Sequence, residues 1–467
     1  MHTSNRRPVH WARPCTPNVV RGAAALLAVT GLSGGFGAQE VGAEQAPVRT
    51  DSLEVLVAEA AEGHPEVQSA LRRVEAARAR VPQAGALPDP TLSGGLMYLP
   101  VPAFDLSADG MTMFNVEFAQ RLPPRGLRAA REAAYLSETE AARAKVDVAR
   151  WSVATRLQEA YFELLLVEEA VAIHHQTHAV LETFAYSAEA AFRQGLAPQA
   201  DVLRAHTELA AIDEHLSELR ERRSAALAQV NTLLGRDTRA PLTPGIPRRL
   251  VELLESEPDP GFLAASVVGV ELGEGYPTLA ELEERALRNR PELALAAHRA
   301  RAAGHRGEAA RRDRRPEISL MGGYSVRSAR SDMISLGLSV ELPVYRSRKQ
   351  DQAVVEAVEE RRAEEMETEV SARNVRREVA RAHAELVRAR EKILLLEEAV
   401  IPQARATVES RAALFRSGEG DFTSLMQAQT TLFRSEIERA HLTAELGQAM
   451  VRLERAMGTE LTREEDR

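Results

Sequence analysis

The chain has a single cysteine, Cys15, which excludes any disulfide bond within one chain. Aromatic residues make up only 4% of the 467 residues, too few for a compact aromatic core. Alanine, glutamate, arginine and leucine dominate instead, a composition typical of long helices and coiled coils. The net charge is −9, with acidic and basic residues interleaved along the chain, and this argues against nucleic acid as a partner.

Catalytic signatures are also missing. The sequence has no glycine-rich phosphate loop, no nucleophile elbow, no paired catalytic carboxylates and no His-Glu-x-x-His pattern. One histidine cluster, formed by His174, His175 and His178, places two imidazoles one helical turn apart, a spacing that can bind a metal ion. No cysteine lies nearby and the second half has no equivalent, so we interpret these histidines as solvated residues on a coiled-coil face. We therefore predict no enzyme activity, no cofactor and no metal site.

Long apolar runs are confined to the N-terminal region. After residue 43 no segment reaches the length of about 18 apolar residues that a membrane-spanning helix needs, so a chain that crosses a membrane would do so with strands. Residues 1–21 contain four arginines and no acid, and Gly22–Ala38 is an uncharged apolar run. This pattern is typical of a secretory signal peptide, which we assign to residues 1–43 with cleavage near Ala38 or Ala43. A membrane anchor is the alternative, but the run is short and glycine-rich. Cys15 precedes the run, so we expect no lipid anchor.

The rest of the chain contains one unit twice. Ser52–Val67 aligns without a gap on Thr278–Leu293, and Phe192–Gly195 matches Phe415–Gly418 at nearly the same offset. Such a regular period indicates a tandem duplication. We assign the first repeat to residues 44–235, a proline-rich connector to 236–277, the second repeat to 278–458 and a C-terminal tail to 459–467.

Each repeat is predicted to place two strands between long helices. The four predicted strands cover residues 91–99, 111–122, 317–326 and 333–342. In the second and fourth of them apolar and polar residues alternate, which is the period of a strand with one apolar face. Arg125–Gln194 is proline-free and would span ~105 Å as one helix. Helices 199–234 and 344–416 show heptad spacing, and Pro402 is expected to kink the latter. The tip turns are predicted at 195–198 and 418–421.

These strands favour a channel over an enzyme. Each is about ten residues long, the length that a tilted strand needs to cross a bilayer. An open four-stranded sheet cannot sit in lipid, because its edges would stay unpaired, so several chains must share one barrel. Two chains would supply eight strands and three would supply twelve. The alternative is a pair of soluble hairpins packed on helices.

The paired tip segments, Phe192–Leu203 and Phe415–Met426, each continue into an Ala-x-Thr pattern. In these features the chain resembles the TolC-like outer-membrane efflux protein family over roughly residues 50–460. The resemblance implies a mainly α fold with a small β part. It also implies a homotrimer with a 12-stranded transmembrane β-barrel, to which each chain adds four strands, and a periplasmic α-barrel of antiparallel coiled-coil helices. The implied partners are a periplasmic adaptor (membrane fusion) protein, an inner-membrane efflux transporter and outer-membrane lipid.

In that family the tip loops meet the adaptor and close the tunnel. The corresponding candidates for docking and gating here are Gly195, Asp201, Gly418 and Asp421. Ser424 and Gln427 stand where some members carry gate acids, so the second repeat departs from the pattern.

Two further features bear on what is transported. Ala86–Pro90 and Leu122–Gly126, which flank the first two strands, are similar to the heavy-metal branch of the family, which serves cobalt–zinc–cadmium and copper–silver pumps. Glu117 and Glu341 fall on the polar strand faces and are candidates for lining the pore, although exposed hairpin charges would look the same.

Arg311–Arg315 precedes the third strand and fits either a belt against lipid head groups or an ordinary charged helix end. The sequence thus predicts a passive outer-membrane channel of a tripartite efflux system. A secretion channel for protein or polysaccharide and a soluble periplasmic coiled-coil scaffold are the alternatives.

Overall fold

The computed structural model describes residues 52–99, 101, 111–255, 276–327 and 330–461. The predicted signal peptide, residues 256–275 of the predicted connector and residues 462–467 of the predicted tail lie outside the described residues.

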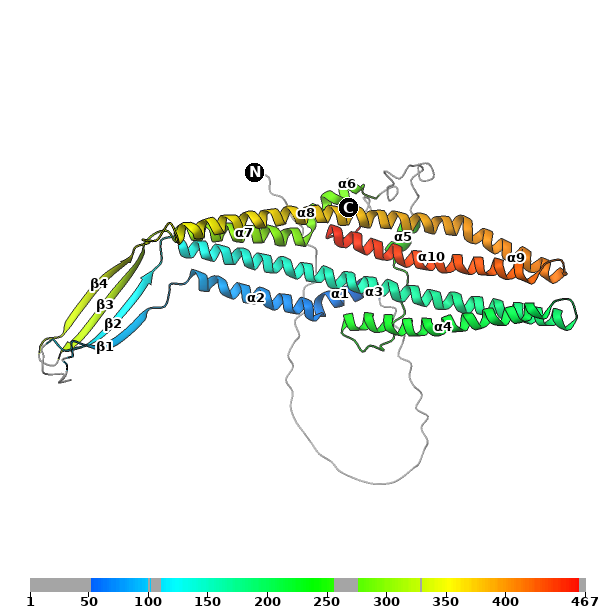
Figure 1. Cartoon of the computed structure of the whole chain (residues 1–467), viewed down its shortest axis with the longest axis horizontal. Helices are drawn as coiled ribbons and strands as arrows, with labels where there is room; N and C mark the ends of the chain where they lie inside the picture. The colour runs from blue at the N-terminus through cyan, green and yellow to red at the C-terminus, as the bar shows by residue number, and fades with distance from the viewer. Residues whose placement is uncertain (1–51, 100, 102–110, 256–275, 328–329, 462–467) are drawn as a thin grey trace, which may run out of the picture. The chain divides into compact units, whose positions relative to one another are not determined.

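The same order of elements occurs twice (Figure 1). The first copy contains α1 Leu53–Gly63, α2 Pro65–Gly85, β1 Thr91–Met97, β2 Met113–Leu122, α3 Leu127–Arg193 and α4 Gln199–Leu234. A short helix, α5 Arg248–Glu255, follows. The second copy contains α6 Leu279–Asn289, α7 Pro291–Arg312, β3 Glu317–Arg327, β4 Met333–Glu341, α8 Gln350–Leu395, a π-helical turn η1 Leu396–Val400, α9 Ile401–Ser417 and α10 Phe422–Met457. The predicted fold class, mainly α with four strands in a duplicated unit, is confirmed.

Proline and glycine set the helix boundaries at matching places in the two copies. Pro65 and Pro291 occupy the first turns of α2 and α7, where proline is tolerated because that N–H has no helical partner. Gly235 and Gly458 end α4 and α10 in the left-handed conformation, which glycine adopts without steric strain. The helix expected from Val344 begins only at Gln350, because residues 344–349 form turns.

Pro402 lies in the first turn of α9, directly after the π-helical turn η1. Proline has no N–H to donate to the preceding turn, and a wider turn accommodates the missing bond. The expected interruption of the long helix therefore takes the form of a π turn, from which the chain continues as α9.

The four strands form one antiparallel sheet in the order β1-β2-β3-β4. The central pairing joins the two repeats, with Phe114 opposite Val326 and Leu122 opposite Ile318. Because strand side chains alternate between faces, this register fixes which side chains share a face. The whole sheet therefore acts as one surface to which both repeats contribute.

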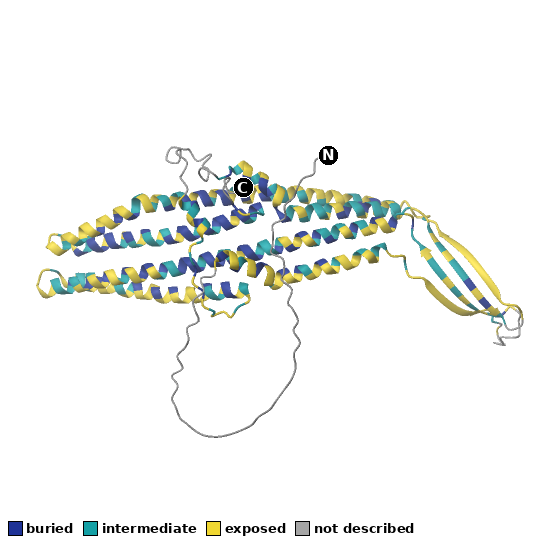
Figure 2. Cartoon of the chain, turned by 180° about the vertical axis from the view of Figure 1, so that it is seen from behind, coloured by how far each residue is buried: buried dark blue, intermediate teal, exposed yellow. Residues whose placement is uncertain are grey.

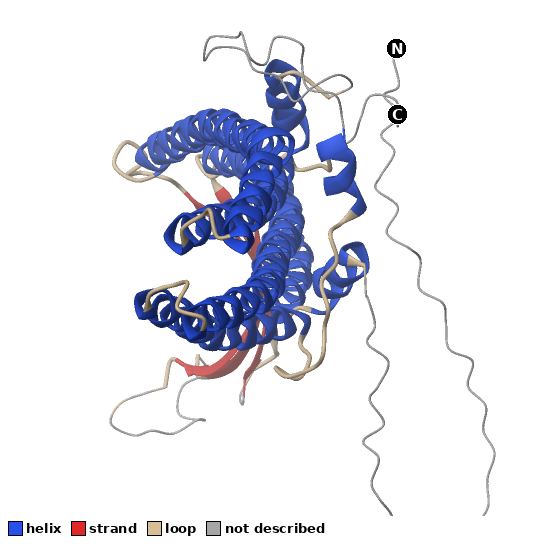
Figure 3. Cartoon of the chain, turned by 90° about the vertical axis from the view of Figure 1, so that its right-hand side faces the viewer, coloured by secondary structure: helices blue, strands red, loops and turns tan. Residues whose placement is uncertain are grey.

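The helical body is held together by contacts between the repeats. α3 packs against α2, α4, α7 and α10, and α8 packs against α7 and α10. At the centre of the main core Phe162 of α3 is fully buried and lies against Gly447 of α10. Seen along their length, the long helices lie side by side in a curved layer (Figure 3), and their buried residues form stripes between neighbouring helices (Figure 2). Among the described residues, none of the helices combines the length and apolar character needed to span a bilayer.

Candidate functional site

The sheet has one apolar face, assembled from all four strands. Leu92 pairs with Phe118, Leu320 with Leu338 and Tyr324 with Ile334, so the large apolar side chains of both repeats lie on the same side. These side chains are exposed, most of all Leu336 at 89% and Ile334 at 77%. Figure 2 shows the two outer strands of the sheet coloured as exposed. An exposed, contiguous apolar face of this kind marks a surface that contacts lipid or another protein.

The opposite face carries most of the polar side chains of the sheet, together with several glycines and methionines. Asn115, Glu117 and Ser325 lie there, with Ser325 Oγ 2.9 Å from Asn115 Oδ1. Glu117 is half-buried opposite Ser93 and Gly323, whereas Glu341 is exposed opposite Glu317. Both candidate pore residues therefore lie on the face away from the apolar side chains, and their role in lining a pore stays a prediction.

The outer edges of the sheet are open. In the part of the chain that the structure describes, β1 pairs only with β2 and β4 only with β3. Each edge presents backbone N–H and C=O groups able to pair with a further strand. The sheet is thus incomplete as a membrane-embedded element.

At the other end of the long helices, two similar turns connect α3 to α4 and α9 to α10. Gly195 and Gly418 adopt positive φ values of 72° and 78°. Leu196 N donates to Ala191 O at 2.9 Å, and Glu419 N donates to Leu414 O at 3.0 Å. These are the bonds of a Schellman cap, which satisfies the last carbonyls of a helix. The duplicated sequence therefore builds the same turn twice.

The two acidic tip residues differ in their environment. Asp421 caps α10 by accepting hydrogen bonds from Ser424 Oγ at 2.6 Å and Ser424 N at 2.8 Å, and these bonds lower the pKa of the Asp421 carboxyl. Partial burial and the nearby Asp421 charge raise the pKa of Asp201, against the opposing effect of Arg204. The structure thus brings together two acids that belong to different repeats of the sequence.

A small core holds the two tips side by side. Phe422 and Met426 of α10 are buried in one cluster with Leu181, Ala185 and other residues of α3 and α4. Arg204 Nη1 of α4 donates to Thr423 Oγ1 of α10 at 3.0 Å. Ser424 Oγ donates to Asp421, which lies three residues earlier in the chain.

The interpretation of the histidine cluster as solvated is wrong for His174. Its side chain is buried against Phe433 of α10 and His215 of α4, and its Nδ1 lies 2.7 Å from Ala170 O. Burial lowers the pKa of His174. The charges of His215 and His175 lower this pKa further, whereas the hydrogen bond to the Ala170 carbonyl raises it. α10 covers this face of α3, a contact that the heptad pattern does not reveal. Among the described residues no group of three or more potential ligands could hold a metal ion.

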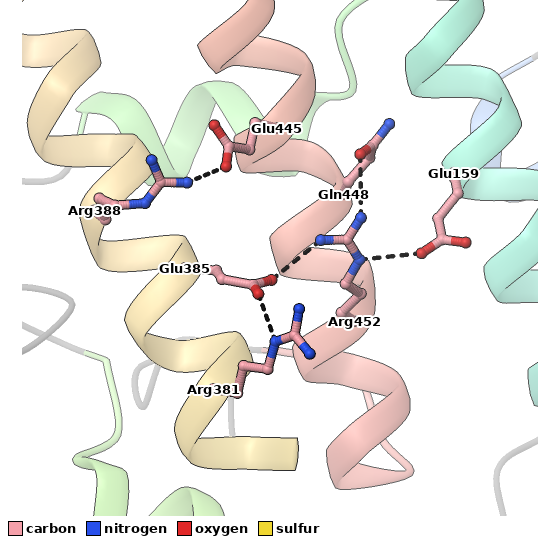
Figure 4. Close-up of polar contacts among 7 residues, drawn as sticks. All are labelled: Glu159, Arg381, Glu385, Arg388, Glu445, Gln448 and Arg452. Carbon is pink, nitrogen blue, oxygen red and sulfur yellow. Dashed lines mark hydrogen bonds and ion pairs between the residues drawn. The ribbon is translucent and has the colours of Figure 1, made fainter. Parts of the chain in front are cut away.

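A charged network that sequence reasoning missed joins α3, α8 and α10 (Figure 4). Arg452 of α10 donates to Glu159 of α3 at 3.2 Å and to Glu385 of α8 at 3.1 Å. Arg381 also bonds Glu385, and Arg388 bonds Glu445. Burial raises the pKa of Glu385, but the hydrogen bonds from Arg381 and Arg452 outweigh it and leave the pKa below its ordinary value. Interleaved charges in the sequence give no sign of which pairs meet.

Comparisons with known proteins agree with this geometry. The family model described as outer membrane efflux protein matches residues 56–236 and 282–459. A search among curated proteins found no match.

Several solved structures share the fold. The outer-membrane channel OprN has 21% sequence identity and a TM-score of 0.70, with 87% of this chain and 89% of that chain covered. The outer membrane protein VceC from Vibrio cholerae has 16% identity and a TM-score of 0.69, covering 88% of this chain and 97% of that one. CusC, described in connection with transmembrane channel formation, has 18% identity and a TM-score of 0.71, with 87% of this chain and 92% of that chain covered.

Proposed function

Because this chain belongs to the outer membrane efflux protein family, we propose that it forms the outer-membrane channel of a tripartite efflux pump. Members of this family are channels of the outer membrane that extend into the periplasm, and they are not enzymes. In the proposed pump, an inner-membrane transporter supplies the energy and a periplasmic adaptor links it to the channel. Substrate then passes through this protein passively to the cell exterior.

The observation that carries the proposal is the sheet with one apolar face and two open edges. In a bilayer, unpaired backbone groups are too costly to remain at an edge, so β4 of one copy must pair with β1 of the next. Three copies, as family members assemble, would join twelve strands with the apolar side chains toward lipid. Glu117 and Glu341 would then face the interior.

The tip turns are the proposed place of docking and gating. Gly195 and Gly418 shape two similar turns, and Leu196 is 76% exposed beside the first. Asp201 and Asp421 add negative charge that a cationic group of an adaptor could pair with. Because α4 and α10 are joined through Arg204 and Thr423, movement of one hairpin would be transmitted to the other.

For the substrate we propose heavy-metal ions, supported by the segments Ala86–Pro90 and Leu122–Gly126. Selectivity would lie mostly in the inner-membrane transporter. Deletion of the gene, followed by growth on zinc, cobalt, copper, dyes and detergents, tests this assignment. Growth inhibition by metals alone supports heavy-metal ions as the substrate. Growth inhibition by dyes and detergents would indicate organic substrates instead. Loss of an exported polypeptide or polysaccharide would favour a secretion channel.

A matched pair of substitutions in β4 tests the channel itself. Leu338 is 64% exposed on the apolar face, and its neighbour Ser339 lies on the polar face opposite Ser319. An arginine on the lipid side of a membrane strand costs about 2–4 kcal/mol at mid-depth, whereas one on the interior side remains hydrated. We expect Leu338→Arg to abolish insertion into planar bilayers and Ser339→Arg to insert with altered conductance. Equal insertion of both variants, or a water-soluble wild-type monomer without conductance, would contradict the proposal.

A further inference from the structure

A pocket of about 480 Å³ lies between the end of α2 and the beginning of α3. Figure 1 shows that these helix ends adjoin the sheet. Arg80 and Gln83 line it from α2, and Arg128, Arg131 and Tyr135 line it from α3. The remaining wall is apolar and includes Leu87, Pro88 and Pro123, which lie beside the ends of β1 and β2. None of the described residues that line the pocket is acidic, and its size is within the ~300–1,000 Å³ typical of ligand sites.

The charges of this pocket are only partly compensated, since Asp313 pairs with Arg131 and the Glu132 carboxylate lies beside Gly85. Arg80 makes no hydrogen bond or ion pair within the described residues. Arg128 Nη1 donates to the carbonyl of Gly85 at 3.0 Å, and Arg131 lies 3.7 Å from Asp313. A guanidinium group has five donors in a planar fork, so each of these side chains keeps donors for a further acceptor. Phosphate and carboxylate are the groups that such forks bind with two parallel hydrogen bonds.

The surrounding sequence extends the positive charge along the same junction. Residues 121–132 contain four arginines and one acid, Glu132, and Arg311–Arg315 contains four arginines and one acid. In the segment after β4, Arg346 shares Asp351 with Arg314, while Arg348 and Lys349 make no ion pair within the described residues. Tyr345 and Val344 are exposed there, at 76% and 77%. Exposed aromatic and basic side chains together are typical of the boundary between lipid and water.

We propose that the pocket formed by Arg80, Arg128 and Arg131 binds the head-group phosphate of an anionic phospholipid in the periplasmic leaflet of the membrane. The inference rests on the proposed function, because only a sheet embedded in lipid brings that leaflet to this junction. Leu87, 44% exposed at the rim, and the prolines beside it would contact the glycerol and the first acyl carbons. That apolar wall favours a lipid over free phosphate.

The test compares Arg80→Gln/Arg131→Gln with a control that loses the same charge elsewhere, Arg376→Gln/Arg377→Gln on α8. Arg128 is left in place because it bonds the Gly85 backbone. Binding of phosphatidylglycerol to the purified full-length protein is measured by native mass spectrometry, with phosphatidylcholine and inorganic phosphate as the other probes. Each arginine near an anionic lipid surface contributes about five-fold in affinity, so the pocket variant should bind phosphatidylglycerol about 25-fold more weakly than wild type. The control should match wild type.

Each outcome decides the proposal. Unchanged phosphatidylglycerol binding in the pocket variant, or equal binding of phosphatidylcholine by wild type, would overturn it. Competition by millimolar inorganic phosphate would assign the pocket to the free anion instead. If the double variant loses helical circular dichroism, Arg80→Gln alone replaces it, with about a five-fold loss expected. Bilayer conductance of the same wild-type sample separates the two hypotheses: conductance without lipid selectivity refutes only the lipid site, whereas absence of conductance refutes the channel.

Discussion

Replacing Gly447 with alanine tests whether the two repeats are joined through the contact between α10 and α3. The Phe162 ring of α3 is fully buried against the backbone of α10 at Gly447. A Cβ at position 447 would lie 2.5 Å from Phe162 Cδ1 and Cζ. Carbon atoms in contact are normally ~3.5–4.0 Å apart, so the ring would have to move by about 1 Å or more.

The expected loss of stability follows from two opposing effects. Forcing a methyl group into a filled core costs about 1–3 kcal/mol. Alanine is a better helix former than glycine by about 1 kcal/mol, which partly offsets the clash. Because Phe162 is enclosed by the main core cluster, the clash dominates, and we expect a net loss of about 1–2 kcal/mol in the free energy of unfolding.

Chemical denaturation of the purified protein, followed by helical circular dichroism, measures this loss. Gly304→Ala on α7 is the control, since a Cβ there would meet only Arg361 Cδ at 3.7 Å and should be neutral or stabilising. The double variant Phe162→Leu/Gly447→Ala should lose about 1 kcal/mol less than the sum of the single variants, because the smaller side chain makes room for the methyl group. Equal stability of Gly447→Ala and Gly304→Ala, or strictly additive losses in the double variant, would refute the packing described here.

Three further predictions concern single polar groups. Burial raises the pKa of Glu454 to about 7, against the opposing effect of Arg249. The folded state therefore holds this proton more tightly than the unfolded state. The free energy of unfolding should fall by about 3 kcal/mol as pH rises from 4.5 through 7. Hydrogen exchange at the end of α10 should show this decrease in wild type and in Glu438→Gln, an exposed residue of the same helix, but not in Glu454→Gln. Asp421→Ala should remove the cap and speed amide exchange in the first turn of α10 by roughly five-fold, with unchanged exchange refuting the cap. Arg452→Gln should lower the free energy of unfolding by about 1 kcal/mol at low salt and by less at high salt. The loss should be larger than that of Arg388→Gln, because Arg452 bonds two carboxylates and Arg388 bonds one.

Much of the local structure was predictable from the sequence. The alternation in Met333–Glu341 identifies a strand with one apolar face, and the structure has a strand there. Gly195 and Gly418 mark turns because each takes a positive φ that other residues adopt at a cost. The helix boundary at Val344 was predicted wrongly, since apolar character does not reveal that residues 344–349 form turns before α8 begins.

The candidate site was only partly predictable. Asp201 and Asp421 stood out as tip acids by their positions, but the bonds of Ser424 to Asp421 and of Arg204 to Thr423 depend on how the two hairpins lie together. His174 was assigned to a solvated face because the pattern of α3 reports its packing on α4 and not its coverage by α10. The pocket around Arg80 is formed by residues of two helices that are separated in the sequence by β1 and β2, so no local sequence motif predicts it.

By itself the sequence determined the duplication, the approximate positions of the strands and the extent of α3 and α4. These features arise from local periodicity and from the fixed conformations of proline and glycine. Only the tertiary structure decided that β2 pairs with β3, which gathers the apolar side chains of both repeats on one face. It also decided that Phe162 lies on Gly447 and that Arg452 bridges two helices. A periodic pattern shows that a residue faces a partner, but the identity of that partner depends on the register and packing between segments of different repeats, which lie far apart along the chain.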